Sequence, residues 1–175
     1  MKTAGVIEHE SSALRGTEEL FNLVIGYGNE LRSDDGAGIR AAEIVESFRI
    51  PDVRVIAAHQ LTPEMAEPIA RSRFVLFLDA LLSDGEARCR IVRLHEARET
   101  RPSGHACSPQ DLLALARRLY GRSPQAWLIG IPTENFALGE SLTPTAQVGV
   151  RLAAECVRDM IWIEEVTGTA ARCTK

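Results

Sequence analysis

Apolar runs of β-strand length alternate along the chain with segments that have the period of an α-helix. Several runs are apolar at consecutive positions, as in FVLFL, which is typical of parallel strands covered on both faces. The predicted strands comprise residues 23–27, 53–58, 74–80, 89–94 and 126–131. Strands that alternate with helices indicate a three-layer α/β sandwich, with helices on both faces of one sheet.

Three helices are predicted where a capping hydroxyl precedes a proline, which suits the first helical position. The pairs are Thr62-Pro63, Ser108-Pro109 and Thr143-Pro144. The second and third of these helices each carry an apolar stripe that we expect to pack on the sheet. The stripes consist of Leu112, Leu115, Ala116 and Leu119 in the second helix, and of Val148, Leu152, Cys156, Met160 and Ile163 in the third.

The size and charge of the chain indicate one domain without a nucleic-acid or membrane partner. The 175 residues carry a net charge of −4, and 45% of them are hydrophobic and 25% charged. We expect a loosely ordered extension at 1–21, a single domain at 22–166 and a tail at 167–175. The four cysteines form no CxxC pair, and the N-terminus has no apolar run typical of an export signal. We therefore expect reduced thiols and a cytoplasmic protein.

The stretch LVIGYGNELRSDDGAGIR, residues 23–40, leads from a strand through a glycine-rich turn into a predicted helix. A dinucleotide-binding fingerprint needs GxGxxG, but Leu31 stands where the third glycine belongs after Gly26 and Gly28. Asp34 and Asp35 would also put negative charge at the helix N-terminus, where a phosphate would bind. A nucleotide-binding module therefore remains only as an alternative.

The two adjacent aspartates have a simple structural interpretation that accounts for one of them. Ser33 or Asp34 is expected to cap the following helix, and Asp35 in its first turn gains from the helix dipole. That helix is predicted to bury Ile39, Ala42, Val45 and Phe48. Because a cap needs only one acid, the second requires another role.

Asp79 suggests that the second acid belongs to a cation site. Asp79 follows five apolar residues at the carboxyl end of a predicted buried strand. A buried carboxylate is costly unless it is paired or bound to a metal. Ligands in open α/β sheets bind beyond the carboxyl ends of the strands, where the strand order reverses. If the first and third strands are neighbours, Asp79 and Asp35 face one crevice and suggest a cation site. The alternative is an ion pair between Asp79 and an arginine such as Arg73.

His105 is the third candidate ligand, because it lies three residues before the helix that begins after Ser108. Helix N-termini in such folds surround the same crevice. Cys107 lies two residues beyond His105, and a Cys/His couple can form a nucleophile. Neighbours in a loop seldom have the required geometry, so a cysteine mechanism is the alternative to a metal mechanism.

Taken together, these motifs resemble those of the hydrogenase maturation proteases, which trim the C-terminal tail of the large subunit of nickel-iron hydrogenases. The matching stretches are GYGNELRSDDGAGIR, HQLTPEMAE, FLDA, SGHACSPQDLLALARRLYG and IGIPTENFALGESLTPTA. The resemblance covers about residues 22–160 and implies a five-stranded, mostly parallel twisted sheet between helices. It implies metal contacts at Asp35, Asp79 and His105, and a substrate-facing loop at His59, Gln60 and Leu61.

The resemblance also implies that the metal is nickel carried by the hydrogenase precursor and used as the recognition point. Two carboxylates and an imidazole suit nickel, zinc or manganese, so another divalent metal can occupy the site in the isolated protein. The metal would either polarise the scissile carbonyl or deliver water, with Asp35 or Asp79 as proton acceptor. The residues alone leave these roles open. They also leave open a nickel-binding chaperone that uses the same ligands without cleavage.

Overall fold

The computed structural model describes residues 20–83, 88–97 and 107–172. Most of the predicted extension at 1–21, the end of the predicted tail, and His105 lie outside these ranges. Within them, no helix is both long and apolar enough to cross a membrane.

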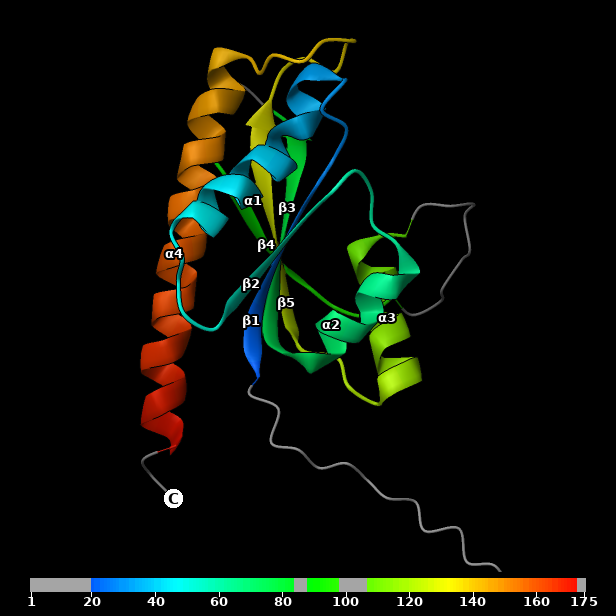
Figure 1. Cartoon of the computed structure of the whole chain (residues 1–175), viewed down its shortest axis with the longest axis vertical. Coiled ribbons are helices and arrows are strands. Elements are labelled where there is room, and N and C mark those ends of the chain that lie inside the picture. Colours follow the sequence, from blue (N-terminus) through cyan, green and yellow to red (C-terminus); the bar gives the residue numbers. More distant parts are fainter. Residues whose placement is uncertain (1–19, 84–87, 98–106, 173–175) are drawn as a thin grey trace, which may run out of the picture.

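The five predicted strands are all present and form one sheet in the order β2-β1-β3-β5-β4 (Figure 1). Their bounds are β1 (Phe21–Tyr27), β2 (Val53–Ala58), β3 (Ser72–Leu82), β4 (Arg90–Leu94) and β5 (Gln125–Thr133). Only β4 runs antiparallel, along β5. β1 and β3 are neighbours, which meets the condition stated above for Asp79 and Asp35, and the strand order reverses between them. Their carboxyl ends therefore lie where ligands bind in open α/β sheets.

Helices cover both faces of this sheet, which confirms the three-layer sandwich (Figure 1). On one face lie α1 (Ala37–Ser47) and α4 (Pro144–Arg172), and on the other lie α2 (Ala66–Arg71) and α3 (Pro109–Tyr120). Two short 3₁₀ turns lead into helices, η1 (Ser33–Gly36) before α1 and η2 (Pro63–Met65) before α2. The helix predicted at Thr62-Pro63 therefore begins as a 3₁₀ turn, without a side-chain cap.

The start of α3 matches its sequence signal closely. The Asp111 N–H donates to Ser108 Oγ at 3.2 Å, and the Ser108 N–H donates to the Asp111 carboxylate at 3.1 Å, which completes a capping box. The predicted stripe is partly wrong, because Leu119 is 60% exposed whereas Leu113 is buried beside Leu112. The buried face of α3 is therefore rotated toward Leu113.

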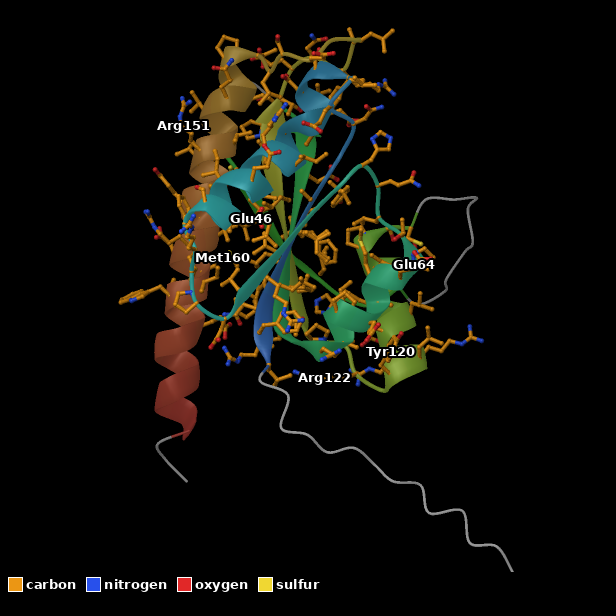
Figure 2. The ribbon with its side chains drawn as sticks, viewed as in Figure 1. Glu46, Glu64, Tyr120, Arg122, Arg151 and Met160 are labelled. Atoms are coloured by element: carbon orange, nitrogen blue, oxygen red, sulfur yellow. The ribbon has the colours of Figure 1, made fainter. Side chains whose placement is uncertain are left out.

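The predicted stripe of α4 is largely wrong, since Val148, Leu152 and Ile163 are all exposed. The face that contacts the sheet instead carries smaller residues, namely Gly149, Val150, Ala153, Ala154, Val157 and Ile161. A Cβ at position 149 would lie 2.7 Å from the Pro132 ring, so the helix packs too closely for larger side chains there. Figure 2 shows Met160, which packs at the edge of this core, and Arg151, which is exposed on the same helix.

Candidate active site

Asp79 lies in the carboxyl-terminal half of the central strand β3, three residues before the strand ends at Leu82, and accepts a hydrogen bond from a tyrosine of the neighbouring strand. The Tyr27 hydroxyl donates a hydrogen bond to Asp79 Oδ2 at 2.7 Å. Arg73, the cation considered from the sequence as its partner, instead pairs with Asp52 at 3.6 Å. Asp79 is therefore a half-buried carboxylate whose hydrogen-bond partner is a neutral phenol.

The surroundings of Asp79 disfavour its charge. Burial raises the pKa of Asp79, and the nearby Asp35 carboxylate raises it further, against hydrogen bonds from Tyr27 and the Ala80 backbone that lower it. Burial and the Asp79 charge likewise raise the pKa of Tyr27, which keeps the phenol protonated as a donor. The effect of the Asp35 charge on Asp79 indicates that the two carboxylates lie in one region, which we expected on the condition that the first and third strands are neighbours. A cation or a proton between them would relieve an unfavourable arrangement.

Asp35 is positioned by the glycine turn that precedes it. The Asn29 N–H donates to Asp35 Oδ2 at 3.0 Å, and Asp35 lies in η1. Gly28 has a φ of 142°, and any Cβ there would collide with the Asp35 backbone carbonyl. The turn therefore packs against the backbone of Asp35, and its Asn29 N–H is already used by the Asp35 carboxylate, which argues against the alternative of a phosphate cradle.

Asp34 has a different role from the helix cap predicted for it. It is fully buried, and neither Asp34 nor Ser33 caps a helix. Its carboxylate accepts hydrogen bonds from three backbone N–H groups and one hydroxyl in the loop between β5 and α4. The donors are Glu134 N (2.9 Å), Asn135 N (3.0 Å), Thr143 N (2.7 Å) and Thr143 Oγ1 (2.8 Å).

These bonds lower the pKa of Asp34, although burial alone would raise it. Two backbone hydrogen bonds also join the turn that carries Asp34 to the β5–α4 loop. The Ser33 N–H donates to Gly139 O at 2.7 Å, and the Gly139 N–H donates to Leu31 O at 3.0 Å. We call this set of contacts the Asp34 clamp. It fixes the turn that carries Asp35 against the β5–α4 loop, so Asp34 is a structural partner of the site that the sequence did not identify.

The substrate-facing loop predicted at His59, Gln60 and Leu61 follows β2. His59 and Gln60 are exposed, and His59 borders a cavity with Asn29 and Leu31. Leu61 is only 3% exposed and belongs to the core on the α2–α3 side. Only the first two side chains of this loop are therefore placed to contact another molecule.

The chain is 27% identical over 143 residues to the Hydrogenase 2 maturation protease of Escherichia coli (strain K12). The match covers 77% of this chain and 87% of that protein. The chain resembles the hydrogenase maturation proteases in sequence. No protein-family model matches it.

The fold is also that of solved maturation proteases. The hydrogenase maturating endopeptidase HybD from E. coli superposes with a TM-score of 0.62 at 24% identity, covering 79% of this chain and 90% of that one. The [NiFe] hydrogenase maturation protease HybD from Thermococcus kodakarensis gives a TM-score of 0.62 at 24% identity, with 81% and 99% covered. Both comparisons agree with the five-stranded α/β sandwich described above.

The metal set that the resemblance implies is only partly within the described ranges. Among the residues of those ranges, no group of three or more His, Cys, Asp and Glu side chains is arranged to hold a metal. Asp35 lies near enough to Asp79 for its charge to affect that carboxyl, and His105 lies outside. Two carboxylates provide oxygen ligands that suit a divalent cation but leave most of its coordination to other donors.

If the chain cleaves a hydrogenase precursor, as the resemblance implies, we expect cleavage to survive the change Cys107→Ser, because this thiol is poorly suited to act as a nucleophile. Burial raises the pKa of Cys107, and the charges of Asp111 and Glu64 raise it further, so the reactive thiolate is disfavoured. The measurement is the rate of precursor cleavage, followed by mass, for Cys107→Ser and for a variant with all four cysteines replaced. Loss of cleavage in a folded Cys107→Ser variant would favour the cysteine mechanism.

Proposed function

We propose that the chain is an endopeptidase that removes the C-terminal extension of a nickel-iron hydrogenase large-subunit precursor. The observation that carries this proposal is that the charge of Asp35 raises the pKa of Asp79, since β1 and β3 are neighbours and bring the two carboxylates into one region. Support comes from the similarity in sequence to the Hydrogenase 2 maturation protease and from the shared fold. A cytoplasmic location and the precursor as partner are part of the same proposal.

In this proposal, nickel belongs to the precursor and serves as its recognition point. Asp35, Asp79 and His105 would complete the coordination of that nickel, which would polarise the scissile carbonyl or activate water. Asp79 is suited to accept a proton, because its raised pKa brings it closer to neutral pH. The hydrogen bond from Tyr27 holds its carboxylate in a fixed orientation.

A carboxylate pair also suits a checkpoint on assembly. Burial and mutual repulsion disfavour the ionised forms of the two carboxylates when no cation is bound. A cation supplied by the precursor would remove this repulsion and would therefore be bound between them. A precursor without nickel would leave the repulsion in place and lose this binding. The tail would then be cut only after the metal has been inserted.

We expect metal-stripped enzyme to cleave a nickel-loaded precursor and to spare the same precursor prepared without nickel. The measurement is the mass of the large subunit before and after incubation with the purified chain. A matched incubation of the loaded precursor with Asp79→Ala provides the control for contaminating proteases.

Two outcomes of this experiment, and a separate thermal-unfolding measurement, distinguish the alternatives. Equal cleavage of the loaded and empty precursors would reject nickel recognition and keep the endopeptidase. Binding of the loaded precursor without any change in its mass would favour the nickel-binding chaperone. Thermal stabilisation by a dinucleotide, with no effect of precursor, would favour the nucleotide-binding module.

A further inference from the structure

Two leucine side chains are exposed on adjoining segments at the carboxyl edge of the sheet. Leu138, in the loop between β5 and α4, is 89% exposed, the highest value among the large hydrophobic side chains of the described residues. Leu31, in the turn between β1 and η1, is 61% exposed. Figure 1 shows both segments at this edge of the sheet. Single exposed leucines are ordinary on protein surfaces, so a role for these two depends on how they are placed.

The backbone holds the two leucines next to each other. The Gly139 N–H donates to Leu31 O at 3.0 Å, and the Ser33 N–H donates to Gly139 O at 2.7 Å, so that Arg32 and Gly139 form a parallel β-bridge. Leu31 and Leu138 directly precede the two residues of that bridge. Neighbouring strands in such pairing lie about 4.8 Å apart, so the two leucines belong to one surface. We call them the leucine pair.

Hydrogen bonds connect the leucine pair to the turn that carries Asp35. The Leu31 N–H donates to Asn29 Oδ1 at 3.0 Å, and the Asn29 N–H donates to Asp35 Oδ2 at 3.0 Å. The Asp34 clamp holds the β5–α4 loop, which contains Leu138, against the same turn. The backbone of the leucine pair is therefore fixed relative to Asp35. Binding to a surface that is already ordered costs less conformational entropy than binding to a loose loop, which favours affinity.

The position of the leucine pair indicates which molecule covers it. Helices cover both faces of the sheet, so a protein whose scissile bond reaches Asp35 and Asp79 approaches at the carboxyl edge, where the pair is exposed. Leu31 also borders the same cavity as His59, the exposed histidine of the predicted substrate-facing loop. The pair is thus continuous with the surface that the proposed function assigns to the precursor.

The charged side chains near the leucine pair in the sequence have both signs. Arg32 in the turn and Glu140 in the loop are exposed, and Glu30 is paired with Arg40 at 2.9 Å. Neither sign of charge on a partner is therefore strongly favoured, and the pair contributes mainly by burying apolar area. Such a surface fits an apolar patch on a folded protein.

We propose that the leucine pair is a docking surface for the folded body of the hydrogenase large-subunit precursor. This contact is separate from the one that the precursor tail makes in the crevice, and it is still available in the mature subunit after the tail has been removed. The inference rests on the proposed endopeptidase function and adds to it the surface that recognises the partner as a folded protein.

Leu31→Ser, Leu138→Ser and the double variant test the docking surface. Serine removes the apolar side chain and keeps the backbone hydrogen bonds of the turn and the loop, and thermal unfolding checks that each variant folds. With the nickel-loaded precursor, we expect KM to rise about tenfold in each single variant and further in the double variant, because burying a leucine contributes at least that much to affinity. We expect kcat to stay within about twofold. Leu119→Ser, 60% exposed near the end of α3, is the matched control and should change neither constant.

The mature large subunit, which lacks the tail, separates the contact of the body from that of the tail. It should inhibit cleavage of the loaded precursor by the unaltered chain. Its inhibition constant should rise about tenfold or more in the double variant, in parallel with KM. A merely structural effect of the substitutions would instead lower the melting temperature or kcat.

The outcomes distinguish this inference from the proposed function. Cleavage by the double variant with KM within about twofold of the unaltered chain would overturn the docking surface alone. A dimer of the unaltered chain in sedimentation that the double variant abolishes, with KM unchanged, would assign the leucine pair to self-association and would also overturn it. Failure of the unaltered chain to cut the loaded precursor at all would overturn the proposed function and this inference with it.

Discussion

Asp79→Asn is expected to reduce kcat/KM for the nickel-loaded precursor by roughly 10²–10⁴-fold, the range typical of a lost proton acceptor. The amide has nearly the same shape as the carboxylate but neither accepts a proton at neutral pH nor binds a cation well. Its oxygen still accepts the hydrogen bond that Tyr27 donates at 2.7 Å in the unaltered protein. The measurement is the rate of cleavage followed by mass.

The same substitution should leave the free energy of unfolding unchanged or higher. The half-buried carboxylate has a raised pKa because burial and Asp35 disfavour its charge, and an amide avoids that penalty. Loss of activity combined with retained stability distinguishes a functional acid from a structural one. The matched control is Asp52→Asn, an exposed acid that pairs with Arg73 and should cleave normally. Normal cleavage by Asp79→Asn would remove this residue from the mechanism.

The strands β1 and β3 were predictable because burial on both faces requires continuous apolar runs, which are visible in the sequence. The position of Asp79 followed from the same reasoning, since a carboxylate directly after such a run must lie at the carboxyl end of a buried strand. Its approach to Asp35 required only that β1 and β3 be neighbours, as they are. The centre of the candidate site is thus largely determined by local sequence and by the topology of open sheets.

Partners of charged side chains were less predictable, because they depend on contacts between distant segments. Arg73 was a plausible partner for Asp79, but it reaches Asp52 at the opposite end of β3. The face of α4 that packs on the sheet was hard to predict for a related reason. Its sequence has apolar residues on two sides, and close approach to Pro132 selects the side with Gly149 and alanines.

The Asp34 clamp was also not predictable from the local sequence, because it depends on contacts between distant segments. A short acid before a helix is the usual signature of an N-cap, and nothing near Asp34 in the sequence indicates otherwise. Its hydrogen-bond donors are 100 to 109 residues away in the chain. Asp34 and Asp35 are adjacent, yet Asp34 is fully buried and accepts four hydrogen bonds from the β5–α4 loop, whereas Asp35 is half-buried and accepts one from the Asn29 N–H. Two identical neighbouring side chains therefore have different surroundings, which the local sequence does not distinguish.

Asp34→Asn is expected to lower the free energy of unfolding by roughly 2–4 kcal/mol, since an amide cannot accept all the bonds made to the carboxylate. The NH₂ group would face backbone N–H groups in a fully buried position and leave donors unsatisfied. Equilibrium denaturation in urea measures the loss. Amide hydrogen exchange of Asn135 and Thr143 should accelerate, because their N–H groups lose their acceptor.

The pH dependence of this loss separates the clamp from a general packing defect. The pKa of Asp34 is lower in the folded protein than in the unfolded chain, because burial is outweighed by the hydrogen bonds from Glu134, Thr143 and Asn135. Its stabilising contribution is therefore complete above the unfolded pKa, near 3.9, and disappears as the pH falls through the lower folded value. The difference in stability between the unaltered chain and Asp34→Asn should accordingly be constant near neutral pH and shrink below about pH 4. Asp159→Asn, at an exposed position on α4, should show no such difference at any pH. A difference that persists unchanged in acid would mean that the charge of Asp34 does not hold the two loops together, and that the clamp depends on shape alone.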